Sequence, residues 1–258
     1  MPPARHLGRH IPWGALPLLL LLLAWELVSR AHIFPDVLLP SPLEVGRAFH
    51  EEWWLIANAV AASVLRVFAG VTLAAITAIP SGLLLGRFDR LYRVMDWTIQ
   101  IFRCFPAIAL VPLAILFFGI GNKPAIILIW ISAFWPLLIN TIFGVHSVER
   151  GLLRIAHSAH ASEAMILREI LLPGALPAIL TGLRLAVGSG WLTVVTAEMI
   201  AVRSGLGYLI MYAQTVFRAD EVLAGMLAIG FIGFLLDLAV RAVRQHVCRW
   251  QEGLVIAQ

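Results

Sequence analysis

Long uncharged runs alternate with short polar segments along the whole chain. Each run approaches the ~20 apolar residues that a helix needs to cross a bilayer. Helices are the expected form, because lipid offers backbone groups no hydrogen-bond partners. The spans expected are at about 11–28, 57–86, 91–118, 124–145, 174–200 and 222–240. The predicted fold class is therefore all-α: a polytopic membrane helix bundle of about six transmembrane helices, forming a single domain over residues 1–258.

The first run has a rival interpretation as a secretory signal peptide, because Arg5 and Arg9 precede a Leu-rich stretch. No small-x-small cleavage site follows that stretch, and five more spans do. We therefore expect the run to be retained as a span.

Small residues recur every fourth position in two of the spans: Gly70, Ala74, Ala78, Gly82 and Gly86 in one, and Gly182, Ala186 and Gly190 in another. This spacing lets another helix approach closely, since packing drives helix association in lipid. Packing within the chain is preferred over a dimer seam. Four prolines fall inside hydrophobic runs and predict kinks there: Pro80, Pro106, Pro112 and Pro136.

The basic residues are spread between the hydrophobic runs, which indicates membrane orientation rather than nucleic-acid binding. Only 13% of the 258 residues are charged and 60% are hydrophobic, which excludes an ordinary soluble domain. Basic residues on the side of the termini are Arg5, Arg9, Arg87, Arg90, Arg93, Arg150, Arg154, Arg168, Arg241, Arg244 and Arg249. Those on the other side are Arg30, Arg47, Lys123, Arg203 and Arg218. The excess predicts that both termini are cytoplasmic.

The polar segment 149–173 predicts two short cytoplasmic helices joined by a turn near 157–162. Two apolar stripes mark them: Leu152, Leu153, Ala156 and Ala159, then Met165, Leu167, Ile170 and Leu171. Ser162 is placed to cap the second helix. An apolar face in such a loop has to pack on its own bundle or on another protein, which favours a docking element over a passive connector.

The stretch RIAHSAHASEAMILREILLPGALPAILTGLRLAVGSGWL, from Arg154 to Leu192, resembles the EAA loop and following span of ABC importer permeases. The run from Leu171 to Ile200 is particularly similar to the aliphatic sulfonate, taurine and nitrate import group. Further similar segments are LLPSP at 38–42, IQIFRCFPAIALVPLAILFFGIG at 99–121 and SGLGYLI at 204–210. They extend the resemblance over nearly the whole chain.

The resemblance implies the type I ABC importer permease fold, with 149–173 as the coupling loop that docks on a separate ATPase. The positions it assigns to coupling are Arg154, Ala156, His157, His160, Ala161, Ser162, Glu163, Ala164 and Pro173. Arg154 stands where the family has its opening Glu, and His160 where it has Gly. The Gly sits at the turn, where positive φ is costly for His. The substitution puts the turn geometry in question, and with it the choice of ATPase.

The partners implied are an ABC ATP-binding subunit in two copies, a periplasmic or lipid-anchored substrate-binding protein, a second permease copy and the lipid bilayer. Nucleic acid is not expected. The localisation implied is the bacterial cytoplasmic (inner) membrane, as a multi-pass protein. No cofactor is expected in this chain, because ATP and Mg would be held by the partner subunit.

No enzyme motif accompanies this pattern: GxxxxGK[ST], GxSxG, HExxH and a Cys cluster are all missing from the sequence. We expect no catalytic residues. The series His157-x-x-His160-x-x-Glu163 would put three metal ligands on one helical face. A turn is predicted there, so docking or solvated side chains are preferred and no metal is expected.

Six charged residues lie within or beside spans: Arg66, Asp96, Arg103, Arg184, Glu198 and Asp237. Charges at this depth usually face protein or water, which makes Arg184, Arg103 and Glu198 candidates for a translocation pathway. Arg184 and Glu198 are too far apart along one helix to pair. The role of Arg184 stays open between an anion contact and a structural one. For Arg103 the structural role is preferred, because it abuts a Pro-broken segment near the inner face.

The leading hypothesis is a permease subunit, acting as a homodimer, that moves a small anion by ATP-driven alternating access. The resemblance points to an aliphatic sulfonate; taurine, nitrate and bicarbonate are the alternatives. A secondary carrier is the main hypothesis from another class, but it predicts an inverted repeat and midplane carboxylates. We find no repeat, and the carboxylates cluster at span ends. An integral membrane enzyme would need a catalytic cluster that the sequence lacks.

Overall fold

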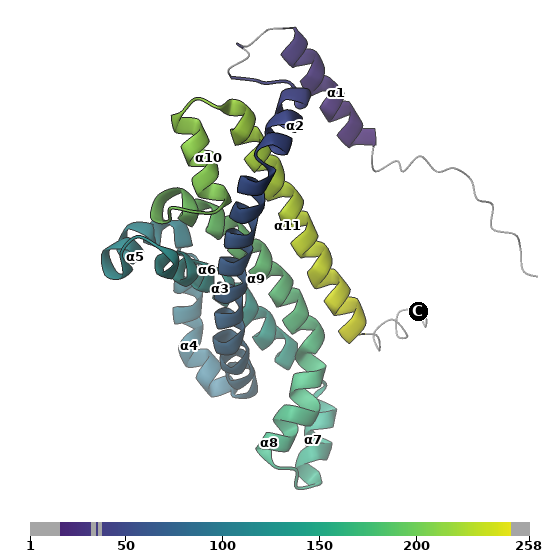
Figure 1. Cartoon of the computed structure of the whole chain (residues 1–258). Helices are drawn as coiled ribbons and strands as arrows, with labels where there is room; N and C mark the ends of the chain where they lie inside the picture. The colour runs from purple at the N-terminus through teal and green to yellow at the C-terminus, as the bar shows by residue number, and fades with distance from the viewer. Residues whose placement is uncertain (1–15, 32–34, 36–37, 249–258) are drawn as a thin grey trace, which may run out of the picture.

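The computed structural model describes residues 16–31, 35 and 38–248, and almost all of them are helical (Figure 1). The helices are α1 Leu16–Arg30, α2 Pro42–Glu51, α3 Trp53–Arg87, α4 Asp89–Phe102, η2 Ala107–Leu110, α5 Val111–Phe118, α6 Asn122–His146, α7 Arg150–Ser158, α8 Glu163–Met165, η3 Ile166–Leu171, α9 Leu172–Ala201, α10 Leu206–Thr215 and α11 Ala219–Val247.

Four described helices are long and apolar enough to cross a membrane: α3, α6, the continuous helix Glu163–Ala201 and α11. A fifth crossing results if α4 and the bent segment Ala107–Phe118 are counted as one. The expected span at 11–28 is represented by α1, which is 15 residues long. Its expected beginning, 11–15, lies outside the described residues.

The centre of the bundle is α6, which packs along both α3 and α9. Glycines allow this approach. A Cβ on Gly70 would lie 2.5 Å from Ile129 Cγ2, and one on Gly82 would lie 2.6 Å from Thr141 Cβ. Gly182 of α9 meets α6 in the same way, at Asn140. The predicted small-residue stripes thus pack within the chain, and the preference for that interpretation over a dimer seam is confirmed.

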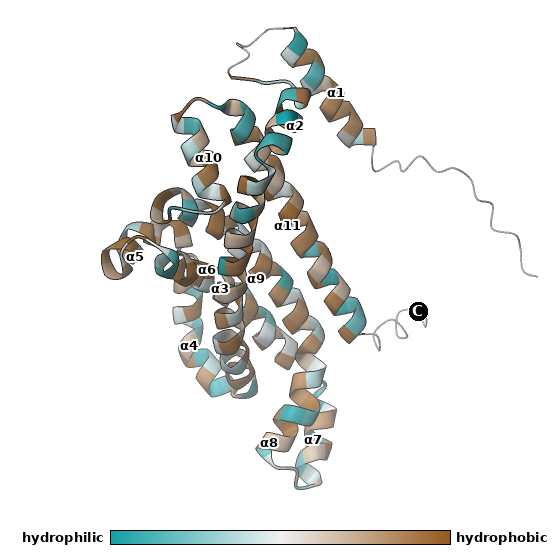
Figure 2. Cartoon of the chain, viewed as in Figure 1, coloured by the Kyte–Doolittle hydropathy of each residue, from teal (hydrophilic) through white to brown (hydrophobic). Residues whose placement is uncertain are grey.

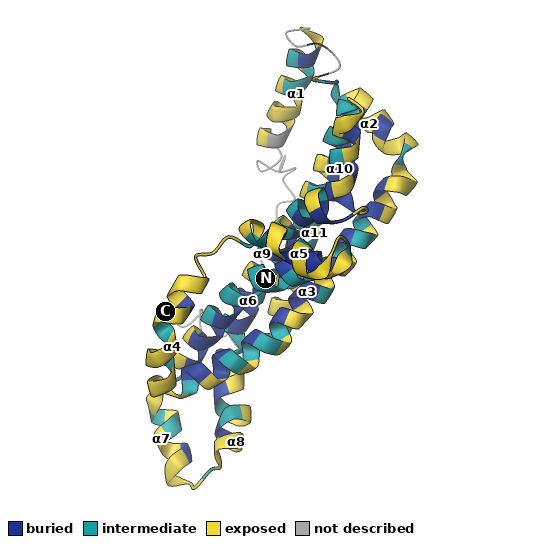
Figure 3. Cartoon of the chain, turned by 90° about the vertical axis from the view of Figure 1, so that its left-hand side faces the viewer, coloured by how far each residue is buried: buried dark blue, intermediate teal, exposed yellow. Residues whose placement is uncertain are grey.

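The outer faces of the long helices are apolar and exposed, as Figures 2 and 3 show together. Phe68, Leu116 and Leu192 are each more than two-thirds exposed. A soluble protein would leave such large patches only at an interface. In a bilayer they need no cover, because lipid tails are as apolar as the side chains.

The range expected as one span at 91–118 is broken. The helix pair meets at 79°, with the break at residues 103–106. Pro106 begins the second arm, and Pro112 stands in the first turn of α5, where its missing N–H costs nothing. Pro80 and Pro136, by contrast, lie inside α3 and α6, which remain continuous.

The two ends of the bundle differ in character. The α7–α8 loop protrudes at one end, and α2 and α10 lie at the other (Figure 1). A capping box starts α2: the Ser41 hydroxyl accepts from Glu44 N at 3.3 Å, and Ser41 N donates to Glu44 Oε2 at 2.7 Å. Pro42 then fixes the first helical turn. The sequence LLPSP therefore encodes a sharp helix start at this end.

Candidate functional site

The α7–α8 loop folds back on itself as two short helical arms. Ser162 begins the second arm, because its hydroxyl accepts a hydrogen bond from Met165 N at 3.3 Å. This is the N-cap that the sequence predicts. The arm then widens into the π-helical turn Ile166–Leu171 just before Pro173. Proline lacks an N–H and crowds the preceding turn, which accounts for the wider winding.

The turn between the arms is a Schellman motif with His160 in the left-handed position. His160 has φ 57, its N–H donates to His157 O at 3.0 Å, and Ala161 N donates to Ala156 O at 3.0 Å. These are the two bonds that normally accompany Gly after a helix. The doubt that His160 raised about the turn is resolved: the geometry forms, with histidine bearing the strain of positive φ.

Replacing His160 with glycine is expected to stabilise the loop. A left-handed L-residue costs about 1–2 kcal/mol, and glycine's extra chain entropy offsets about 0.5–1 kcal/mol of the gain. Hydrogen exchange of residues 150–171 should slow, and the melting temperature should rise slightly. Ala159→Gly is the matched control: Ala159 has φ −82, so glycine there should only loosen the turn. Equal loosening by both changes would mean that the His160 side chain holds the turn.

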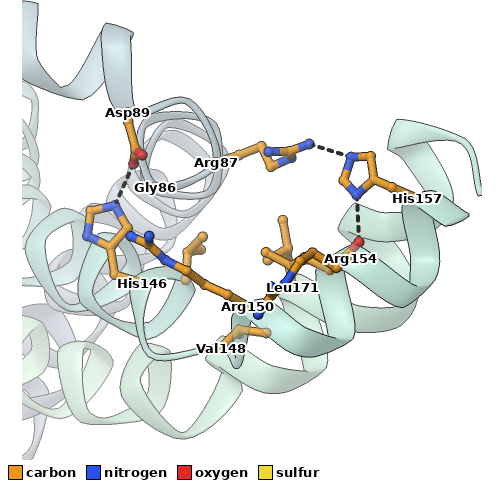
Figure 4. Close-up of a pocket in the computed structure, with 11 residues that line it drawn as sticks. Gly86, Arg87, Asp89, His146, Val148, Arg150, Arg154, His157 and Leu171 are labelled. Carbon is orange, nitrogen blue, oxygen red and sulfur yellow. Dashed lines mark hydrogen bonds and ion pairs between the residues drawn. The ribbon is translucent and has the colours of Figure 1, made fainter.

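Arg87, at the end of α3, clamps the loop to the bundle (Figure 4). Its Nε donates to Glu163 Oε2 at 3.0 Å and its Nη2 to Glu163 Oε1 at 2.9 Å. Nη2 also lies 3.2 Å from His157 Nε2, while His157 Nδ1 lies 2.6 Å from Leu153 O. Because Arg87 only donates, this network assigns the neutral tautomer with the proton on Nδ1. His157 Nε2 also lies 3.6 Å from Glu163 Oε1, and no group of three or more potential metal ligands gathers among the residues that the structure describes.

Arg87 also lowers the pKa of a carboxyl group in the loop. Its hydrogen bonds hold the pKa of the Glu163 carboxyl, which lies in the polar loop ahead of the apolar span, below the usual value. The ion pair with Arg87 thus favours the ionised form of this carboxylate. Sequence reasoning missed Arg87, because 76 residues separate it from Glu163 and no local pattern connects them.

A cavity of about 720 Å³ lies between this loop and the C-terminal ends of α3 and α6. Three arginines line it, Arg87, Arg150 and Arg154, whereas Asp89 is its one carboxylate. His146 lies 3.9 Å from Asp89. The surplus of positive charge beside the loop suits an acidic partner surface.

The outward face of the loop is apolar. Ile155 is 68% exposed and Leu152 50%, whereas Ala156 is buried and Leu153 packs against the core. The predicted apolar stripe is divided between two environments: Ala156 and Leu153 face the bundle, whereas Leu152 and Ala159 are exposed. In the second stripe Met165 is exposed, and Ile166, which was not predicted, is fully buried. Leu152 belongs to the predicted stripe, whereas Ile155, the more exposed of the two, was not predicted.

The other predicted coupling positions lie on the same loop. Arg154, His160, Ser162 and Ala164 are exposed, Ala161 is half-buried, and Pro173 is exposed at the start of α9. Eight of the nine positions thus lie on the protruding loop, and Pro173 follows in the first turn of α9.

Of the three pathway candidates, Arg184 has a partner on a neighbouring helix. Its Nε donates to Asp237 Oδ1 at 2.5 Å and its Nη2 to Asp237 Oδ2 at 3.1 Å. Arg241 adds a contact to the same carboxylate at 2.6 Å. This bidentate pair fastens α9 to α11. The sequence left Arg184 open between an anion contact and a structural role, and these contacts are structural.

Glu198 is fully buried in a polar network at the α2–α10 end of the bundle. Its Oε1 accepts from Arg66 Nη1 at 2.6 Å, and its Oε2 accepts from Ser63 Oγ at 2.9 Å and Gly207 N at 3.0 Å. Glu198 and Arg184 do not pair, as expected. A carboxylate enclosed in this way has no exposed face for a solute in this structure.

Arg66 extends the network to two further segments. Its Nε donates to Asn122 Oδ1 at 2.8 Å, Nη1 donates to Ser204 O at 3.1 Å, and Nη2 donates to Ser204 Oγ. A Cβ on Gly205 would collide with the Glu198 carboxyl group. The network therefore ties α3, the start of α6 and the end of α9 to the 203–207 turn.

Arg103 is the pathway candidate without such a partner. Its side chain is exposed and makes no hydrogen bond or ion pair within 16–31, 35 and 38–248. It stands at the far end of α4, which starts at the coupling-loop end and rises for 14 residues, or about 21 Å. Arg103 lies at the 79° break, beside the Pro-broken segment as expected, and its position relative to the membrane faces stays a prediction.

Residues 70–251 match the family model described as "Binding-protein-dependent transport system inner membrane component". The taurine transport system permease protein TauC of Escherichia coli (strain K12) is 35% identical over 255 residues, 95% of this chain and 91% of that protein. The putative aliphatic sulfonates transport permease protein SsuC of the same strain is 34% identical, over 88% and 87%. The MetNI methionine ABC transporter in an inward-facing conformation has a similar fold, with TM-score 0.68 and 20% identity over 76% of this chain and 98% of that one.

Proposed function

The chain belongs to the family of binding-protein-dependent transport system inner membrane components, and on this premise we propose that two copies of it form the pathway of an aliphatic sulfonate importer. The chain is a multi-pass permease of an ABC importer in the sulfonate, taurine and nitrate group, with the type I permease fold. ATP is hydrolysed in that class by a separate subunit.

The observation that carries the proposal is the protruding α7–α8 loop. It presents an apolar face, Leu152 and Ile155, beside a cationic cavity. Arg87 ties the same loop to the end of a membrane-spanning helix. A partner that moves the loop therefore moves α3 as well. We assign this role to an ATP-binding subunit, which would hold ATP and Mg, with one copy under each permease.

The mechanism we assign is alternating access. ATP binding favours one arrangement of the assembly, and the loops transmit that preference to the spans. A substrate-binding protein delivers the solute at the opposite end of the bundle. Both termini are assigned to the cytoplasm on the distribution of arginines, which puts the α7–α8 loop on the side of the ATPase.

The anionic character of the cargo is supported by Arg103. An arginine at bilayer depth without a protein partner faces water or a solute, because burial in lipid is costly. Two copies of the chain would supply two such arginines to one pathway. Glu198 and Arg184 are better described as structural, since both are committed to ion pairs.

The experiment is purification of a tagged copy from its native membrane in mild detergent, followed by uptake in vesicles. A stoichiometric ATPase should co-purify, and shortening residues 157–163 should release it. With the binding protein added, the assembly should accumulate a sulfonate only when ATP is present. Uptake driven by an ion gradient without the ATPase would instead identify a secondary carrier, and uptake of nitrate or bicarbonate alone would change the cargo.

A further inference from the structure

A second cavity, of about 630 Å³, lies along α10 at the end of the bundle opposite the coupling loop. It is formed by the first turns of α3 and by α10 and its two flanking turns. Its size is within the range of small-molecule sites. The charged residues that line it are Arg203, Arg218, Glu52 and Glu221.

Arg203 marks one end of this cavity, and the cavity lining includes unused hydrogen-bond donors. Arg203 is exposed and makes no side-chain hydrogen bond or ion pair in the part of the chain that the structure describes. The same holds for the Asn58 amide and the Tyr208 hydroxyl, which line the cavity with it. A guanidinium, an amide and a phenol are all donors from which sulfonate oxygens can accept hydrogen bonds.

This end is also held in place. Arg203 leads into the turn that the Arg66–Glu198 network fixes through Ser204 and Gly207. The backbone that presents Arg203 is therefore anchored to α3 and α9. Fixed donors lose less freedom on binding than donors on a mobile loop.

The opposite end of the cavity carries surplus negative charge. Arg218 Nη1 pairs with Glu221 Oε1, Nη2 lies 3.3 Å from Asp220 Oδ2, and Nη1 lies 3.9 Å from Glu52 Oε1. Three carboxylates thus surround one guanidinium. Because α10 separates Arg203 from Arg218 by about 15 Å of helix, the cavity is positive at one end and negative at the other.

We propose that this cavity receives the sulfonate on the delivery side and selects it by the charge of its tail. The inference rests on the proposed function and deepens it. Arg203, Asn58 and Tyr208 bind the sulfonate group, while the carboxylate excess at Glu52 favours a cationic tail, tolerates a neutral one and rejects an anionic one. The preferred class is an ω-aminoalkanesulfonate, of which taurine is the two-carbon member.

The test uses three probes of similar size: taurine with a cationic tail, ethanesulfonate with a neutral tail and sulfoacetate with an anionic tail. Each is titrated against the co-purified permease–ATPase complex in nanodiscs, without the binding protein, by saturation-transfer NMR. Affinity should fall in that order by roughly three- to tenfold per step, the effect of one charge at about 8–10 Å in a partly wet cavity.

Two variants test the contributions of the two ends of the cavity separately. Arg203→Gln should weaken all three probes by roughly tenfold to a hundredfold, since a charge-assisted hydrogen bond is lost. Glu52→Gln should leave ethanesulfonate unchanged and reduce the spread between taurine and sulfoacetate. Arg47→Gln is the matched control, because Arg47 is exposed on α2 and lines none of the cavities described here.

Equal affinities for the three probes, no taurine signal from the intact complex, or unchanged binding in Arg203→Gln would each overturn the inference. ATP-driven uptake by the complete transporter, measured in parallel, distinguishes failure of this site from failure of the proposed function. Sulfonate uptake combined with equal affinities for the three probes would reject this site alone. No uptake of any sulfonate by an intact assembly would reject the proposed function.

Discussion

Glu198→Gln alone is expected to lower the stability of the permease by about 3–5 kcal/mol, whereas Glu198→Gln combined with Arg66→Met should recover much of that loss. The single change leaves the Arg66 guanidinium buried without its carboxylate, and removing one partner of a buried pair has a cost of that size. In the double variant the amide oxygen introduced in place of the carboxylate can still accept from Gly207 N and Ser63 Oγ, and no charge is buried.

The measurement is thermal unfolding of the detergent-solubilised protein for the wild type, both single variants and the double variant. The coupling between the two sites should reach about 2 kcal/mol or more, well beyond the additive limit for independent residues. Transport should fall with the singles, because the 203–207 turn loses its anchor. Additive losses would contradict the prediction and would mean that Arg66 acts through Asn122 and Ser204 rather than through Glu198. Arg47→Gln again serves as the control for loss of one arginine.

Features set by neighbouring residues in the sequence were predictable. Ser162 caps its helix because the capping hydrogen bond runs only three residues along the chain. The small-residue stripes of α3 and α9 pack on α6 because a spacing of four keeps them on one helical face. The long spans follow from hydropathy alone, since lipid imposes helices wherever apolar runs are long enough.

Features that depend on pairing between distant segments were not predictable. Arg66 and Glu198 are 132 residues apart, and Arg184 and Asp237 are 53 apart, so no sequence pattern indicates which charge meets which. The same limit hid Arg87 from the predicted coupling loop. Choosing among Arg103, Arg184 and Glu198 as pathway residues required knowing which of them already had partners.

The loop helices show a different limit. In the nine-residue α7, a face covers only two or three positions, and the bundle can pack against either of two adjacent faces. The spacing of apolar residues left open whether the stripe faces the bundle or a partner, and the Schellman turn and the Arg87 clamp orient the helix with Ala156 inward and Ile155 outward. Tertiary constraints thus decide which apolar residues remain for a partner.

Ile155→Asp is consequently expected to release the ATPase and to abolish ATP-driven uptake. Ile155 is the most exposed apolar side chain of α7, and a fully desolvated contact at the centre of an interface is worth at least about 2 kcal/mol. Placing a carboxylate there adds the cost of burying a charge without a partner. The Arg87–Glu163 clamp does not involve Ile155, so the permease itself should fold and melt as the wild type does.

The measurement is the stoichiometry of the co-purified ATPase, with Leu43→Asp as the matched control. Leu43 is 62% exposed at the opposite end of the bundle, so the same change there tests the general effect of an added carboxylate. Full ATPase retention in Ile155→Asp would place the docking contact elsewhere, and the cationic cavity lined by Arg150 and Arg154 would be the next candidate. Loss in both variants would instead indicate that the assembly is sensitive to added negative charge at any exposed position, which the apolar docking face does not predict. Loss in Ile155→Asp alone, with the permease intact, is the outcome that the exposed face and the rigid clamp together require.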